Sequence, residues 1–81
     1  MATLAEIRSE LPKIIRDVAG VPIEDIQPDR TFTGDLDIDS LSMVEILVAC
    51  EEQFGVKIPD EQLKQLTTVD DVVAYIERSQ P

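Results

Sequence analysis

The sequence predicts an all-α fold: a small four-helix bundle with three longer helices, one short helix, and a long loop between the first and second helices. Three stretches repeat apolar residues at steps of three and four, the spacing of a helix with one buried face. The glycines, Gly20, Gly34 and Gly55, all fall where this periodicity breaks. The chain has 81 residues and is 43% hydrophobic, enough for one small core. We therefore expect residues 1–81 to form a single domain.

The first helix is expected to run from Leu4 to about Val18. Thr3 and Glu6 have the spacing of a capping box at its start. Pro12 lies inside the segment, where its ring removes a backbone donor and crowds the preceding turn. It predicts either a kink or a helix that begins later. The apolar face consists of Leu4, Ile7, Leu11, Ile14, Ile15 and Val18.

Residues 20–39 form the long loop, because two prolines and Gly34 prevent an extended regular element. A connection of this length needs packing of its own or has a function. A short helical turn is expected around Glu24–Ile26. The residues expected to attach the loop to the core are Ile23, Ile26, Phe32, Leu36 and Ile38.

Three further helices are expected after this loop. The second runs from Ser40 to Phe54, with the Asp39 carboxylate as its N-cap. A short third helix follows Pro59 and covers about Asp60–Leu66. The fourth covers about Val69–Arg78, with Thr68 as its N-cap and apolar residues at helical spacing.

Composition excludes several functions. A net charge of −10 disfavours nucleic acid and anionic membranes as partners, and favours proteins with basic patches. The sequence has neither a membrane-spanning apolar run nor a signal peptide, and its single cysteine, Cys50, cannot form an internal disulfide. A cytoplasmic location is expected. Without histidine, the chain cannot build a Ser-His-Asp triad, and no metal site is predicted. We expect a protein that is not itself an enzyme.

The second helix carries two apolar stripes, although a domain of this size rarely buries both. One stripe is predicted to face the core: Met43, Ile46, Leu47, Cys50 and Phe54. The other contains Leu41, Val44 and Val48, with Glu45, Glu51 and Glu52 within or beside it. No lysine or arginine occurs from Thr31 to Val56. An apolar strip with an acidic border indicates a docking surface for a partner that is apolar at its centre and basic at its edge.

Ser40 begins this helix, directly after Asp39. A serine hydroxyl without a neighbouring base is a poor nucleophile, so most residues in this position only start a helix. A helix N-terminus does, however, tolerate an attached phosphate.

The segment from Asp35 to Glu45, Asp-Leu-Asp-Ile-Asp-Ser-Leu-Ser-Met-Val-Glu, resembles the phosphopantetheine attachment motif of acyl carrier proteins. The resemblance extends over nearly the whole chain. It includes Phe32, the run from Glu51 to Phe54, Ile58–Glu61, Thr67–Val69 and Tyr75–Ile76. It is strongest to the discrete, type II fatty-acid-synthesis carriers of actinobacteria.

This resemblance implies that Ser40 carries 4'-phosphopantetheine derived from coenzyme A, with Asp39 part of the attachment motif. A phosphopantetheinyl transferase would attach the arm, whose thiol holds the acyl chain as a thioester. The implied partners are fatty acid synthase enzymes such as the malonyl transferase, ketosynthase, ketoreductase, dehydratase and enoyl reductase. The carrier is expected to be a monomer. The implied partner surface is Leu41, Val44, Glu45, Val48, Glu51 and Glu52. The implied acyl-chain cavity is Met43, Ile46, Leu47, Cys50, Phe54, Ile58, Leu63, Leu66, Val73 and Ile76.

Other interpretations are open at this stage. Asp35, Asp37 and Asp39 match the start of a calcium-binding EF-hand loop, but Ser40 and Ile46 stand where that loop needs glycine and glutamate. An acidic inhibitor that occupies a basic groove would not need Ser40. The acidic approach to Ser40 disfavours a peptidyl carrier, which usually has glycines there. A discrete polyketide-synthase acyl carrier protein shares the motif and remains an alternative.

Overall fold

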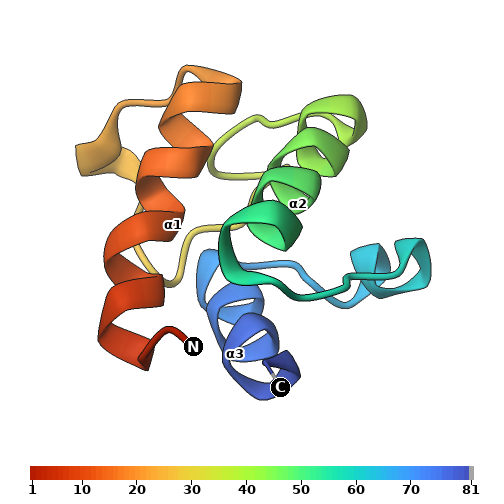
Figure 1. Cartoon of the computed structure of the whole chain (residues 1–81). Coiled ribbons are helices and arrows are strands. Elements are labelled where there is room, and N and C mark those ends of the chain that lie inside the picture. Colours follow the sequence, from red (N-terminus) through yellow and green to blue (C-terminus); the bar gives the residue numbers. More distant parts are fainter. Residues whose placement is uncertain (81) are drawn as a thin grey trace.

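The computed structural model describes residues 1–80, which form three α-helices, two short 3₁₀ helices and no β-strand (Figure 1). In chain order the elements are α1 (Leu4–Ala19), η1 (Ile23–Asp25), α2 (Ser40–Phe54), η2 (Asp60–Lys64) and α3 (Val69–Ser79). The all-α prediction is confirmed, but the short helix predicted over about Asp60–Leu66 is not confirmed as an α-helix. The predicted segment is a 3₁₀ helix of five residues, in which Gln62 N–H donates to the Pro59 carbonyl at 2.9 Å. A segment this short makes i→i+3 bonds more readily than a full α-helical turn.

Helix α1 starts where its cap predicts. The Glu6 N–H donates to the Thr3 hydroxyl at 3.2 Å, and the Thr3 N–H donates to the Glu6 carboxylate at 2.9 Å. The helix runs uninterrupted through Pro12 to Ala19, so the alternative of a later start is wrong. It ends at Gly20, whose φ of 73° suits a residue without a Cβ.

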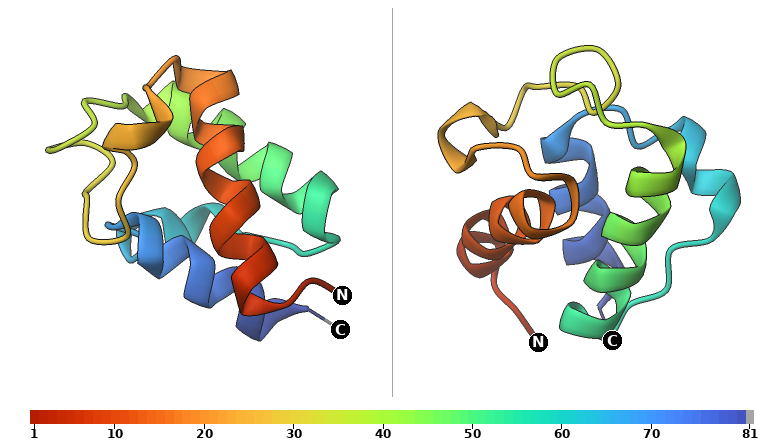
Figure 2. Two further views of the ribbon diagram at one scale, coloured as in Figure 1. Left: turned by 90° about the vertical axis from the view of Figure 1, so that its left-hand side faces the viewer. Right: turned by 90° about the horizontal axis from the view of Figure 1, so that it is seen from above.

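The core lies where α1 meets both α2 and α3 (Figure 1). Ile7, Leu11 and Ile15 of α1 are fully buried, as are Ile46 of α2 and Ile76 of α3. The start of the chain and the end of α3 lie at the same end of the bundle (Figure 2). The Gln80 side chain joins them, since its amide donates to the Ala2 carbonyl at 2.8 Å and its oxygen accepts from the Ala2 N–H at 2.6 Å.

The long loop between α1 and α2 arches over one end of the helices (Figure 2). Four of its five predicted anchors are buried: Ile26, Phe32, Leu36 and Ile38. The prediction for Ile23 is wrong, because η1 leaves this side chain 38% exposed. The Phe32 N–H donates to the Thr67 carbonyl at 3.1 Å, beside an antiparallel bridge between Thr31 and Thr68. These bonds fix the loop beside the start of α3.

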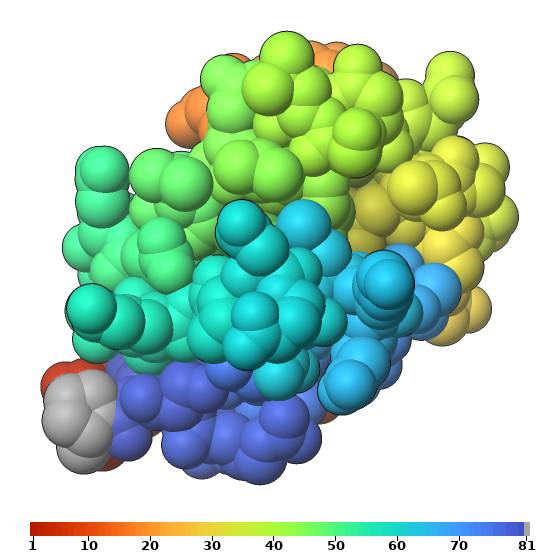
Figure 3. Space-filling view, turned by 90° about the vertical axis from the view of Figure 1, so that its right-hand side faces the viewer, coloured from red at the N-terminus to blue at the C-terminus, as the bar shows by residue number. Residues whose placement is uncertain are grey.

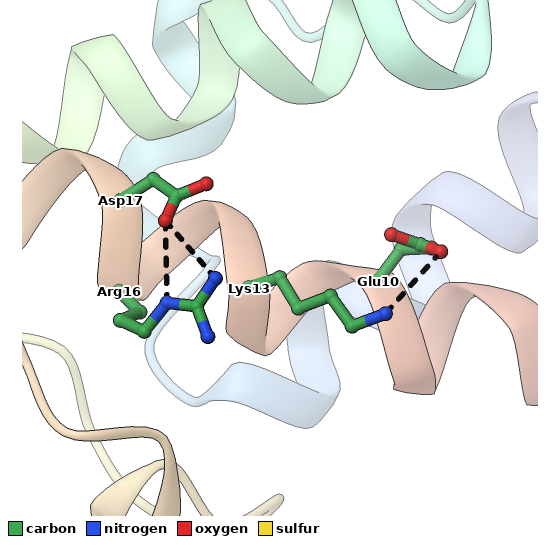
Figure 4. Close-up of polar contacts among 4 residues, drawn as sticks. All are labelled: Glu10, Lys13, Arg16 and Asp17. Atoms are coloured by element: carbon green, nitrogen blue, oxygen red, sulfur yellow. Dashed lines mark hydrogen bonds and ion pairs between the residues drawn. The ribbon is translucent and has the colours of Figure 1, made fainter.

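Helix α1 contains three of the seven basic residues of the chain, and each of the three forms an ion pair. Lys13 lies 3.8 Å from the Glu10 carboxylate, and Arg16 lies 3.2 Å from that of Asp17 (Figure 4). Arg8 pairs with Asp70 of α3 at 3.5 Å. All three pairs are about half exposed, so each contributes little to stability.

None of the helices formed by residues 1–80 is long and apolar enough to cross a membrane.

Candidate functional site

The site begins at the N-terminus of α2. The Asp39 carboxylate accepts a hydrogen bond from the Ser42 N–H at 2.8 Å, which confirms the predicted cap. This bond and contributions from neighbouring groups lower the pKa of Asp39 below its ordinary value. Because Asp39 caps the helix, the hydroxyl of Ser40 is not needed for that purpose. Ser40 is exposed at the first position of the helix.

The chain approaches Ser40 through a hydrogen-bonded turn. The Thr31 N–H donates to the Asp35 carboxylate at 2.9 Å, and the Asp35 N–H donates to the Thr31 hydroxyl at 2.9 Å. Asp37 follows with a φ of 54°, which makes it the one non-glycine residue within residues 1–80 that adopts positive φ. Buried Leu36 and Ile38 flank it. The turn therefore holds the start of α2 in place and directs Ser40 outward.

The two stripes of α2 separate as predicted, except that Phe54 of the predicted core stripe is only half-buried. Met43, Ile46, Leu47 and Cys50 are buried. On the other stripe, Leu41 is 70% exposed, Val48 is 45% exposed and Val44 is 38% exposed. The exposed stripe starts beside Ser40 and runs along α2 from Leu41 to Val48. Figure 3 views the molecule from the side on which α2, the η2 segment and the loop meet.

The acidic residues of the second stripe differ in their surroundings. Glu45 and Glu52 are exposed. Glu51 is half-buried, and its carboxylate accepts a hydrogen bond from the Ile58 N–H at 2.7 Å. Glu51 therefore holds the connection between α2 and η2, a role that the sequence pattern did not indicate.

A mainly apolar hollow of about 260 Å³ lies beside Ser40, between α2, η2 and the loop. Three of the predicted cavity residues line it: Met43, Leu63 and Leu66. Phe32 and Lys64 also line it, and neither was predicted as a site residue. Phe32 could have been found from its place in the family motif. Lys64 gives no local signal, because only the fold brings it near Ser40. The remaining lining residues are Thr33 and Thr67.

A second hollow of about 100 Å³ lies further along α2. It is lined in part by Leu47, Ile58 and Leu63, so Leu63 borders both hollows. The other predicted cavity residues line neither of these two hollows. Ile46, Cys50, Val73 and Ile76 are packed in the core, and Phe54 is half-buried. A larger open hollow of about 670 Å³ beneath the loop is mainly polar and does not reach Ser40.

The one cysteine of the chain lies inside the core. Burial, aided by the negative charge of Glu51, raises the pKa of the Cys50 thiol to about 12. The thiol therefore stays protonated and unreactive at neutral pH.

Two of the three aspartates just before α2 accept hydrogen bonds from the backbone. Asp35 accepts from Thr31 and Asp39 accepts from Ser42. Within residues 1–80, no three acidic or cysteine side chains gather closely enough to hold a metal ion.

Comparison with known proteins identifies the family. Residues 9–76 match the family described as the phosphopantetheine attachment site. The acyl carrier protein of Acidothermus cellulolyticus is 59% identical over 71 residues, which cover 88% of this chain and 84% of the relative. The chain belongs to the acyl carrier protein family. The acyl carrier protein of Kineococcus radiotolerans is 51% identical over 80 residues, 99% of both chains. The meromycolate extension acyl carrier protein of Mycolicibacterium smegmatis is 54% identical over 77 residues, 95% of this chain and 78% of the relative.

Membership of this family defines the cofactor and the class of function. Acyl carrier proteins hold phosphopantetheine covalently and are carriers rather than catalysts. The resemblance to actinobacterial carriers is confirmed, and the polyketide alternative gains no support from these relatives. The residues beside α2 fit the group: an exposed hydroxyl opens onto an apolar hollow that a slender chain can enter.

Proposed function

We propose that this acyl carrier protein carries growing chains of fatty acid synthesis on 4'-phosphopantetheine attached to Ser40, as a single domain and monomer of the cytoplasm. The observation that supports this most directly is the exposed Ser40 hydroxyl, left free by the Asp39 cap, beside an apolar hollow. When bound, the arm supplies the thiol that holds the acyl chain as a thioester. The chain's own residues attach, shelter and present it.

The attachment requires a phosphopantetheinyl transferase. The Ser40 oxygen forms a new bond to the phosphorus next to the pantetheine of coenzyme A, the pyrophosphate bond breaks, and adenosine bisphosphate leaves. The serine proton passes to a general base in the complex with the transferase. Asp39 supports the reaction by ordering the turn that presents Ser40.

Intact mass tests this assignment. The apo protein, incubated with coenzyme A and a transferase, should gain the mass of one phosphopantetheine. Ser40→Ala should abolish the gain while the helical circular dichroism spectrum is unchanged. Ser42→Ala, two residues further along α2, is the matched control and should be modified like the wild type. Modification of Ser40→Ala would exclude Ser40 as the attachment residue.

We further propose that Leu41, Val44, Glu45, Val48 and Glu52 form the docking surface, with Glu51 at its edge. The apolar side chains would supply contact area and the exposed carboxylates would attract basic partners. The expected partners are the transferase and the enzymes of the fatty acid synthase, namely the malonyl transferase, ketosynthase, ketoreductase, dehydratase and enoyl reductase.

Charge reversal tests the docking surface. Glu45→Lys should weaken binding to a ketosynthase, whereas Glu77→Lys on the exposed surface of α3 makes the same charge change away from α2. The wild-type affinity should fall as salt rises, because exposed charges are screened. If the two variants weaken ketosynthase binding equally, the docking surface does not lie on α2.

A further inference from the structure

We propose that Lys64 is the counter-ion of the phosphodiester on Ser40 and holds the arm across the apolar hollow beside α2. This inference rests on the proposed attachment at Ser40. Lys64 and Ser40 both line the same hollow of about 260 Å³, although they are far apart in the sequence. Lys64 is the only basic residue in that lining.

The start of α2 does not by itself provide for a phosphate. Its free N–H groups and positive dipole end would ordinarily attract an anion. In this protein the Asp39 carboxylate already takes the Ser42 N–H at 2.8 Å and interacts with the N–H of Leu41. A phosphodiester on Ser40 therefore adds negative charge next to an existing carboxylate, with Asp35 and Asp37 in the preceding turn. A nearby cation would offset part of this repulsion.

Lys64 is placed to supply this cation. It is the last residue of η2, and its exposed side chain is a flexible stem with a terminal ammonium group. The ion pairs found within residues 1–80 use Arg8, Lys13 and Arg16, so Lys64 is not engaged in one of them. The neighbouring Leu63 and Leu66 line the hollow as well, and Leu66 is buried in the core. They hold the backbone of this segment against the molecule, while the side chain of Lys64 is exposed.

The arrangement divides the arm between two environments. Its charged phosphate would lie between Ser40 and Lys64 at the edge of the hollow. Its less polar remainder would lie against Phe32, Met43 and Leu63. Tethering at Ser40 makes the contact intramolecular, so a single weak ion pair is enough to bias where the arm rests. A partner enzyme that presents its own basic groups can then compete with Lys64 for the phosphate.

The test compares apo and holo forms of the full chain. Wild type, Lys64→Gln, Lys64→Arg and Lys57→Gln are each loaded to completion with coenzyme A and a transferase, and loading is verified by intact mass. Lys57 is exposed, carries the same charge and does not line the hollow, so Lys57→Gln is the matched control. Two quantities are measured: the holo-minus-apo difference in melting temperature, and the phosphorus-31 chemical shift of the holo form.

For Lys64→Gln at low salt we expect the holo-minus-apo difference to fall by roughly 2 to 5 °C relative to wild type. The phosphorus resonance should move as well. Lys57→Gln should match the wild type in both measurements, Lys64→Arg should stay close to it, and molar salt should remove the effect. An unchanged difference and an unchanged resonance in Lys64→Gln would overturn the proposal. Failure of the wild type to gain mass would instead overturn attachment at Ser40, and the Lys64 proposal with it.

Discussion

Asp37 offers a sharp test of the turn that presents Ser40. Its φ of 54° places a residue with a Cβ in the left-handed region, just before α2. This conformation costs most residues roughly 1 to 2 kcal/mol, with a smaller cost for aspartate and asparagine. Glycine avoids the cost but loses more backbone entropy on folding, roughly 0.5 to 1 kcal/mol relative to alanine. Asp37→Gly should therefore be more stable than Asp37→Ala by about 0.5 to 1 kcal/mol.

The comparison separates conformation from charge. Asp37→Gly and Asp37→Ala remove the same carboxylate, so the self-repulsion of a protein with net charge −10 is relieved equally in both. Asp37→Asn removes the charge and keeps a side chain that tolerates left-handed backbone. Its stability should therefore lie between those of the wild type and Asp37→Gly, or close to that of Asp37→Gly. Asp35→Gly is the control outside the left-handed region. It should destabilise, because it removes the acceptor of the Thr31 N–H.

Thermal unfolding followed by circular dichroism measures these differences. For a domain of this size, 0.5 to 1 kcal/mol corresponds to a shift in melting temperature of roughly 2 to 8 °C. The reasoning is refuted if Asp37→Ala unfolds at the same temperature as Asp37→Gly or above it, since alanine gains nothing from positive φ.

Three further predictions follow from the site. Ile46→Ala should lower the free energy of unfolding by about 2 to 5 kcal/mol in urea titrations, whereas Val48→Ala should change it by less than about 0.5 kcal/mol, because only Ile46 is buried. Equal losses would contradict the two-stripe description. The contribution of Asp39 to stability should be lost at acid pH as its carboxyl protonates: the hydrogen bond from the Ser42 N–H lowers the pKa of Asp39 in the folded protein, so this contribution is complete above the unfolded pKa and disappears as the pH falls through the folded one. Melting temperatures of the wild type and Asp39→Asn should therefore converge as the pH is lowered below the ordinary range of an aspartate; a constant gap would argue against this bond. Iodoacetamide at pH 8 should alkylate Cys50 only in step with unfolding by urea, because its pKa is about 12; rapid reaction without denaturant would place the thiol outside the core.

Local chemistry explains why most helix boundaries could be predicted. Thr3, Asp39 and Thr68 each cap the helix that follows them, and each forms the side-chain hydrogen bond expected of its type. The predicted bounds of the second helix, Ser40–Phe54, coincide with those of α2. Caps and apolar spacing involve residues only a few positions apart, so they can be recognised from the sequence alone.

The predictions that differ from the structure concern segments whose conformation or exposure depends on contacts between residues far apart in the sequence. Residues 60–64 form a 3₁₀ helix because the short segment must lead from Pro59 to the buried Leu66, and apolar spacing over so few residues does not distinguish the two helix types. Ile23 is apolar but lies on the outward side of η1, and the path of a loop is not encoded by periodicity. The hollow that Lys64 and Ser40 both line and the bond from the Ile58 N–H to Glu51 depend on tertiary packing in the same way.

The distribution of charge explains how the second apolar stripe of α2 remains uncovered. Arg8, Lys13 and Arg16 are all on α1, and each lies beside a carboxylate. The positive charge of that helix is therefore largely neutralised there, as Figure 4 shows for Lys13 and Arg16. Glu45 and Glu52 lie beside the stripe, in a stretch of the sequence that contains no lysine or arginine. A second copy of this chain would bring like charge to like charge, which opposes self-association through the stripe. A partner with a basic border meets no such repulsion, so the exposed apolar surface discriminates between partners by charge before any side chain is in contact.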